Sequence, residues 1–290
     1  MSMVEVNGVN LFQSDSGAGQ SVVLVHGIGG DYRSWSSQVD ALSREYRVLT
    51  YSRRMSFPNQ NRGDILTDTI ANNSEDLAEL IKKLGIAPVH LVGHSLGGFV
   101  AAYFASQHPE MLRSLALVEP AVSSILLTNP NSRLQLLIFF LSHPSTAMAA
   151  ADFSGGAKRA IKILKENGDS KKAAQIFVDT IQNTQGAFDR FPEEFRKIVT
   201  DNANTILDVD ITPPQFTKED TRRISTPTLL ITGETSHKIL RVITFNLSRY
   251  IPNSKLVSIA GSGHFPQIEK SEEFNSILKD FLRRRSGKPT

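Results

Sequence analysis

The chain carries, at residues 92–98, the stretch Val-Gly-His-Ser-Leu-Gly-Gly. An apolar run ends at Val92, and residues 99–105 follow as a helical pattern with little polar interruption. A sharp turn from a strand into a helix crowds the positions two before and two after its central residue, where glycine fits because it has no Cβ. The stretch therefore predicts that the Ser95 hydroxyl stands above the end of a strand. The first N–H groups of the helix, led by Leu96, would face the same space.

Strand and helix patterns alternate on both sides of this turn. The predicted strands cover residues 2–6, 10–13, 21–25, 46–51, 90–92, 112–118, 226–232 and 255–260. The predicted helices that alternate with them cover residues 32–43, 70–84, 99–105, 238–250 and 271–285. Short connections between such elements predict an α/β fold with a mostly parallel central sheet and helices on both faces. Ligands of these sheets bind at the carboxyl ends of the strands.

The alternation stops between residues 123 and 222, where no convincing strand pattern occurs. Helical patterns cover residues 132–142, 155–167, 171–186 and 192–206, separated by glycine or proline. We therefore expect an inserted helical cap at 123–222, over a core formed by residues 1–122 and 223–290. Its many Leu, Ile and Phe residues favour an apolar pocket above the sheet.

Composition limits the classes of protein to consider. The 290 residues carry a net charge of +3, and they show no basic stripe with interleaved aromatic residues, so we expect no nucleic-acid partner. There is no cysteine, hence no thiolate nucleophile or thiolate metal site. The most apolar run, residues 136–141, is far shorter than the roughly 20 residues of a membrane span. We expect a cytoplasmic protein, monomer or homodimer, that acts on a small molecule without membrane insertion.

A serine hydroxyl becomes a good nucleophile only when a base takes its proton. Among seven histidines, His264 is the best placed, in the loop Gly261-Ser262-Gly263-His264-Phe265-Pro266 after the last predicted strand. Its glycines allow the backbone to bend so that the imidazole reaches back over the sheet. His237 is the rival base. His26 is expected to brace its own loop, and His94 to pack beneath the turn.

Three motifs together resemble the α/β-hydrolase superfamily: Val25-His26-Gly27-x-x-Gly30, Gly93-x-Ser95-x-Gly97 and Gly263-His264-x-Pro266. The resemblance covers nearly the whole chain outside the insert. It implies the α/β-hydrolase fold with an inserted helical cap. It also implies that the backbone N–H of Ile28 joins that of Leu96 in an oxyanion hole. No residue pattern indicates a cofactor or a metal.

The position of the third catalytic group departs from the superfamily. The base needs an acid that holds its tautomer and stabilises the imidazolium. Most members carry this acid three residues past a glycine, after the strand that re-enters the core, and here that position is Ser236. Glu119 resembles the acid of other branches and ends an apolar strand, where an unpaired carboxylate is costly. Glu234 is the alternative acid, and a water-supported Ser–His dyad is a third possibility.

A second departure concerns residues 51–62, which overlap the predicted polar loop at residues 52–66. Relatives often carry Asp-x-x-Gly-x-Gly-x-Ser in this part of the chain, whereas this chain has Arg53 and Arg54. These arginines would contact substrate or hold a carboxylate of the loop, and we favour the structural role.

The sequence thus predicts a serine hydrolase that cleaves a carboxylic ester or a lactone through an acyl-enzyme. Ser95 would be the nucleophile, His264 the base and Glu119 the acid. The same triad could instead serve C–C bond hydrolysis, perhydrolysis or a lyase reaction, and a non-enzymatic ligand sensor is the alternative of another class. Serine at position 95 argues against dehalogenases and epoxide hydrolases, which need an aspartate there.

Overall fold

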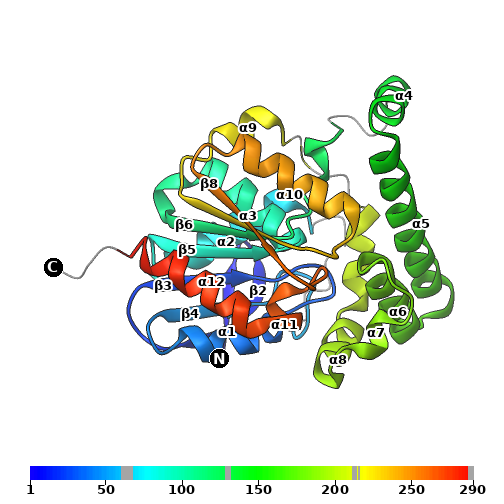
Figure 1. The fold of residues 1–290 in the computed structure, drawn as a ribbon. Helices are drawn as coiled ribbons and strands as arrows, with labels where there is room; N and C mark the ends of the chain where they lie inside the picture. Colours follow the sequence, from blue (N-terminus) through cyan, green and yellow to red (C-terminus); the bar gives the residue numbers. More distant parts are fainter. Residues whose placement is uncertain (60–67, 128–131, 211–213, 215, 287–290) are drawn as a thin grey trace.

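An eight-stranded sheet forms the centre of the computed structural model, which describes residues 1–59, 68–127, 132–210, 214 and 216–286 (Figure 1). The strand order is β1-β2-β4-β3-β5-β6-β7-β8. The strands are β1 (Ser2–Val6), β2 (Val9–Ser16), β3 (Ser21–Val25), β4 (Arg47–Tyr51), β5 (Val89–His94), β6 (Leu112–Val118), β7 (Thr228–Gly233) and β8 (Ser254–Ile259). The six strands from β4 to β8 in this order run parallel to one another. Strand β2 pairs antiparallel with both β4 and β1.

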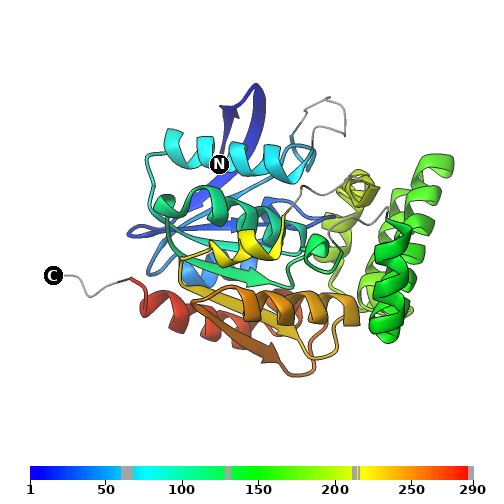
Figure 2. The same ribbon diagram turned by 90° about the horizontal axis from the view of Figure 1, so that it is seen from above.

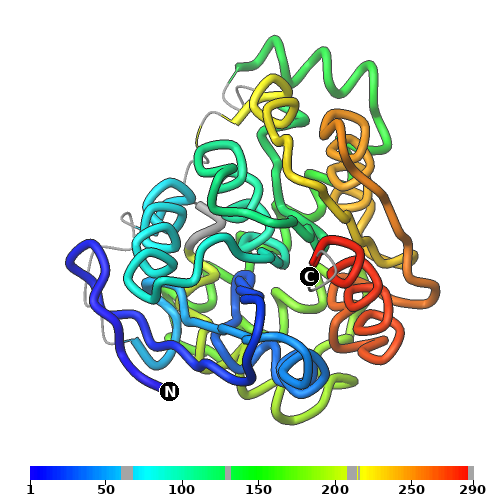
Figure 3. The backbone as a smooth tube through the Cα atoms, turned by 90° about the vertical axis from the view of Figure 1, so that its left-hand side faces the viewer, coloured from blue at the N-terminus to red at the C-terminus, as the bar shows by residue number. Residues whose placement is uncertain are grey.

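The two antiparallel strands form a hairpin at one edge of the sheet. Asn7 and Gly8 connect them with φ values of 47° and 77°, which is the backbone that a tight two-residue hairpin turn requires. Figure 3 shows this hairpin at one side of the molecule, and β8 with the neighbouring helix at the opposite side. The mostly parallel sheet predicted from the sequence is confirmed.

Helices cover both faces of the sheet, which explains why its central strands β3, β5 and β7 are buried along their whole length. One face carries α1 (Ser36–Leu42) and α12 (Ser271–Arg283), whose Leu42 and Phe274 pack in one cluster with Val22 and Leu24 of β3. The alternate residues of β3 face the other way, toward α2 (Ile70–Lys83), α3 (Leu96–Gln107) and α10 (Lys238–Tyr250).

The helical insert, called the cap below, stands beside the carboxyl ends of the strands (Figures 1 and 2). It contains α4 (Arg133–Ser142), α5 (Pro144–Asn167), α6 (Ser170–Ile181), α7 (Ala187–Arg190) and α8 (Glu193–Asp201), followed by the 3-10 helix η5 (Ala203–Asp210). The other short elements among the described residues are η1 (Tyr32–Trp35), η3 (Pro109–Met111), η4 (Ser123–Ile125), α9 (Lys218–Arg222) and α11 (Pro266–Glu269). The domain limits at 122 and 222 stay a prediction.

Three predicted helix boundaries in the cap were wrong. The pair Gly155-Gly156 was expected to separate helices, but α5 continues through it. The reason is packing: a Cβ on Gly156 would lie 2.2 Å from Thr180 Oγ1, so the glycine lets α5 and α6 approach closely. The predicted helix 171–186 ends earlier, at Ile181, and the predicted helix 192–206 ends at Asp201 and continues as η5.

Residues 60–66 of the predicted loop 52–66 lie outside the described residues. Within the described ranges, no helix combines the length and the apolar character needed to cross a membrane.

Candidate active site

The turn after β5 has the geometry expected from its glycines. Ser95 has φ 54° and ψ −119°, a backbone conformation that residues with a side chain rarely adopt. A Cβ on Gly93 would lie 2.3 Å from the Gly97 carbonyl oxygen, and a Cβ on Gly97 would lie 2.4 Å from the His26 carbonyl oxygen. The backbone N–H of Ser95 donates to the Val118 carbonyl at 2.9 Å, so the serine sits beside the end of β6. Strain of this kind is concentrated at functional sites.

Glu119, the residue after β6, meets His264 there. Its Oε2 lies 3.2 Å from His264 Nδ1, and both side chains are buried. The imidazole therefore carries its proton on Nδ1, toward the carboxylate. His264 Nε2 is also buried and has no hydrogen-bond partner among the described residues.

The Glu119 carboxylate is surrounded by donors. Oε1 accepts from Thr232 Oγ1 and from the Gly233 backbone N–H, the latter at 2.7 Å, and Oε2 accepts from Ser236 Oγ as well as from His264. Both oxygens of this buried carboxylate therefore have hydrogen-bond partners, as buried polar groups normally do. At position 236, where the resemblance places the acid of most members, the Ser236 hydroxyl donates to the Glu119 carboxylate at the end of the neighbouring strand.

The alternative acid and base have other partners. Glu234 is exposed, and its carboxylate accepts from the Gly261 backbone N–H at 3.0 Å, which braces the loop after β8. His237 is buried at the start of α10, where its Nδ1 accepts from the Ile239 N–H and its Nε2 lies 3.8 Å from Asp152 Oδ2 of the cap. Burial lowers the pKa of His237.

Two further histidines support the loops around the serine, as expected. His26 Nδ1–H donates to the Gly27 carbonyl at 2.8 Å, and His26 Nε2 accepts from the Arg53 N–H at 2.9 Å. Burial, with the Arg53 charge, lowers the pKa of His26 to about 3. His94 donates from Nε2 to the His264 carbonyl at 2.9 Å, and its ring lies 4.7 Å from the His264 ring. Burial holds the pKa of His94 well below its usual range.

The two predicted oxyanion donors line the same cavity as Ser95. Among the described residues, neither the Ile28 N–H nor the Leu96 N–H donates to a protein acceptor. The next amide in the first loop is held from the cap: the Gly29 N–H donates to Thr205 Oγ1 at 2.8 Å. Gly29 has φ 71°, which suits glycine and turns this loop.

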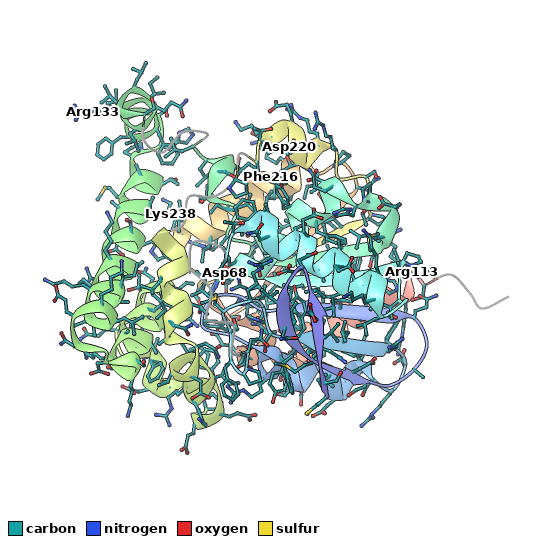
Figure 4. The ribbon with its side chains drawn as sticks, turned by 180° about the vertical axis from the view of Figure 1, so that it is seen from behind. Asp68, Arg113, Arg133, Phe216, Asp220 and Lys238 are labelled. Atoms are coloured by element: carbon teal, nitrogen blue, oxygen red, sulfur yellow. The ribbon has the colours of Figure 1, made fainter. Side chains whose placement is uncertain are left out.

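A cavity of about 270 Å³ lies in front of the serine, between the core and the cap. Its lining is mostly apolar. The apolar residues are Leu126, Leu127, Phe139, Ala150, Phe153, Phe177 and Ile181 from the insert at 123–222 and Ile28, Ile70, Leu96, Phe99, Ala121, Ile239, Leu240 and Ile243 from the core, and Ser95, Ser123 and Asp68 add polar groups. Asp68 is the one ionisable side chain among these residues. Figure 4 shows it at the start of α2, on the side that faces the cap.

The cap also holds the histidine loop, which sequence reasoning missed. Gln182 Oε1 accepts from the His264 backbone N–H at 3.1 Å, and Gln182 Nε2 donates to Glu269 Oε1 at 2.9 Å. Glu269 accepts in turn from the N–H groups of Gly263 and Phe265. A Cβ on Gly263 would meet Gln182, which explains the glycine before His264. No local pattern marks Gln182, because its partners are some 80 residues away.

The two arginines of the loop after β4 have structural partners, as we favoured, but the carboxylates that they contact lie in α2 or just before it and not in the loop. Arg54 contacts both carboxylate oxygens of Asp76 in α2. Arg53 is buried, and its Nη1 lies 3.6 Å from Asp68 Oδ1. In the described part of the chain, no group of three or more His, Cys, Asp or Glu side chains is arranged to hold a metal ion.

The site combines a serine on a strained turn with a buried Glu–His pair. Both lie at the carboxyl edge of a parallel sheet and under a cap, and this arrangement is typical of hydrolases. The chain belongs to the α/β-hydrolase fold family, whose model matches residues 20–271. A 2-hydroxy-6-oxononadienedioate/2-hydroxy-6-oxononatrienedioate hydrolase of Burkholderia vietnamiensis is 27% identical over 283 residues, covering 93% of this chain and 90% of that protein.

Solved structures share the fold. A thermophilic esterase from Thermogutta terrifontis superimposes with a TM-score of 0.71 at 22% identity, covering 99% of this chain and 100% of that one. Est816, described as an N-acyl homoserine lactone degrading enzyme, superimposes with a TM-score of 0.65 at 20% identity, covering 97% and 100%.

Proposed function

We propose that the protein is a serine hydrolase that cleaves a carboxylic ester or a lactone through an acyl-enzyme. One observation carries the proposal. The Glu119 carboxylate lies 3.2 Å from His264 Nδ1, and His264 Nε2 is buried near the strained serine turn with no partner among the residues that the structure describes. An imidazole held in this tautomer is a general base that still needs its proton donor.

In the proposed reaction, Ser95 Oγ attacks the carbonyl carbon while His264 Nε2 takes its proton. The negative charge that develops on the carbonyl oxygen is stabilised by the N–H groups of Ile28 and Leu96. The imidazolium, stabilised by Glu119, then gives its proton to the leaving alcohol. Water, deprotonated by the same Nε2, releases the acid and restores Ser95.

Glu119 is the proposed acid because its carboxylate reaches the imidazole and is stabilised by three further donors. Glu234 is the weaker alternative because it is exposed and its carboxylate is engaged by the loop after β8. The cavity supports an apolar acyl or alcohol group in the substrate. We further propose that the enzyme works in the cytoplasm as a monomer or homodimer, a state that light scattering after size exclusion would reveal.

The test combines a fluorophosphonate probe with a panel of esters and lactones. We expect the probe to label the wild-type protein and to leave Ser95→Ala unlabelled. We expect p-nitrophenyl esters or lactones to be hydrolysed by the wild type alone. Labelling without turnover of any ester or lactone would favour the ligand sensor. Cleavage of a C–C bond in a vinylogous diketone, without ester hydrolysis, would assign the triad to that reaction instead.

A further inference from the structure

Asp68 is an ionisable residue in the mostly apolar lining of the cavity beside Ser95. It immediately precedes the helix cap of α2, its side chain is fully buried, and it is the one ionisable group among the described residues that line the cavity. Its Oδ1 accepts from Asn73 Nδ2 and lies 3.6 Å from Arg53 Nη1. Within the part of the chain that the structure describes, its Oδ2 has no hydrogen-bond partner. A buried acceptor without a donor is costly, so a donor from a bound molecule would be strongly favoured there.

The charges around Asp68 indicate a neutral donor. The Arg53 guanidinium already faces the Asp68 carboxylate, and the nearby Arg54 is paired with Asp76. A second cation at Oδ2 would therefore leave a net positive charge in a cavity with almost no other polar groups. A hydroxyl adds a donor without adding charge, so it satisfies Oδ2 at the lower cost of desolvation.

The sheet topology indicates which part of the substrate reaches Asp68. Glu119 and His264 follow β6 and β8, on one side of β5, whereas β3 and β4 lie on the other side. Arg53 follows β4 and contacts Asp68, and its backbone N–H donates to His26 in the loop that carries Ile28. Because the leaving alcohol takes its proton from His264, the alcohol lies on the β6–β8 side. The acyl chain then extends toward β4 and Asp68.

We propose that Asp68 Oδ2 accepts a hydrogen bond from a hydroxyl on the acyl part of the substrate, so that the preferred substrates are hydroxyacyl esters or the corresponding hydroxylated lactones. The proposal rests on the proposed hydrolase function. Asp68 is a specificity-determining residue here, since the same buried site disfavours an acyl chain that leaves Oδ2 without a donor. Sites that hydrogen-bond a substrate hydroxyl discriminate strongly against the analogue that lacks it.

The test compares ethyl esters in matched sets: hexanoate, octanoate and decanoate, each with its 3-hydroxy and ω-hydroxy derivative, and with the ω-amino derivative. We measure kcat/KM for the wild type, Asp68→Asn, Asp68→Leu and Arg53→Met/Asp68→Leu. Asp15→Asn is the control, since it removes an Arg-paired carboxylate of β2, outside the residues that line the cavity. The double variant avoids leaving the Arg53 charge without Asp68, and probe labelling with thermal unfolding confirms that each variant is folded.

We expect the wild type to favour one hydroxy ester by about tenfold or more over its plain analogue. Asp68→Leu and the double variant should lose this preference and gain activity on plain esters, whereas Asp68→Asn, which keeps an acceptor oxygen, should retain part of it. Equal activity on hydroxy and plain esters, or a preference for the ω-amino ester, would overturn the proposal. In both cases the hydrolase would remain established. A protein that hydrolyses none of the esters and resists the probe would instead refute the underlying function.

Discussion

Replacing Glu119 by glutamine perturbs the proposed triad with almost no change in volume. The carboxylate now accepts from Thr232 and Gly233 at Oε1 and from Ser236 and His264 at Oε2. A glutamine has one acceptor oxygen and one NH₂ donor. If its oxygen replaces Oε1, its NH₂ faces His264 Nδ1, which must then become the acceptor. The proton moves to Nε2, and the imidazole can no longer take the proton of Ser95.

The magnitude follows from this tautomer. Loss of both the correct tautomer and the stabilised imidazolium lowers kcat by about 10⁴ in comparable serine triads, or roughly 5 kcal/mol of transition-state stabilisation. We therefore expect Glu119→Gln to lower kcat by about 10³–10⁴-fold with little change in KM. The measurement is steady-state hydrolysis of an activated ester, with the concentration of folded protein fixed by circular dichroism.

Glu234→Gln is the matched control, because it makes the same chemical change in the exposed glutamate of the neighbouring loop. We expect it to change kcat by less than about threefold, as is usual for surface substitutions. A Glu119→Gln protein within tenfold of the wild type would refute our assignment of the acid. An equal or larger loss in Glu234→Gln would transfer the role to Glu234.

Three further outcomes follow from contacts around the site. Thr205→Val removes the acceptor of the Gly29 N–H, so the free energy of unfolding, measured by urea titration, should fall by about 1–3 kcal/mol. We also expect a lower kcat with little change in KM. An unchanged kcat would show that the loop of Ile28 keeps its position without this contact from the cap. Gln182→Leu frees the His264 N–H and should lower kcat, whereas Asn183→Ala, at the next position, should not; equal effects would contradict the positioning role. The free energy of unfolding should fall below about pH 6.5, because folded His26 has a pKa of about 3 whereas the unfolded chain binds the proton more readily. This difference in pKa corresponds to about 5 kcal/mol lost between pH 6.5 and pH 3. A His26→Asn protein with the same pH dependence of stability would show that His26 is not its cause.

The fold was predictable because its determinants are local. The apolar strand at 21–25 and the glycines at 93 and 97 carry their meaning within a few residues. The strand is buried on both faces, and each glycine would place a Cβ within 2.5 Å of a backbone oxygen. The same locality misled us at Gly155-Gly156, where glycine serves packing of α5 on α6 and not the end of a helix. A local rule cannot separate these two uses, because Thr180 is distant in the sequence.

The candidate site could be anticipated from the sequence only where a residue follows a strand. Ser95, Glu119 and His264 each follow the carboxyl end of a strand, so parallel topology brings them to one edge. The cap contributes Gln182 and Thr205, which hold the loops of the site from positions that no motif marks. Their role depends on how the cap packs on the core, and this packing is the sum of many weak contacts across distant segments.

The position of the acid can be tested by moving it. Ser236 Oγ donates to Glu119 Oε2, the same oxygen that faces His264 Nδ1, so we expect a longer acidic side chain at position 236 to reach the imidazole. We expect Glu119→Ser to lose most of kcat, and Glu119→Ser combined with Ser236→Asp to recover at least tenfold of that loss, as measured by ester hydrolysis. Recovery would follow because a carboxylate at 236 would face the same Nδ1 and would remain near the Thr232 and Gly233 donors.

The single variant Ser236→Asp should not raise kcat, because it places a second carboxylate against Glu119, and two close carboxylates cannot both remain charged without cost. Failure of the double variant to exceed Glu119→Ser, in a protein that still folds, would mean that the strained backbone at Glu119, with φ 48°, is itself needed to aim the acid.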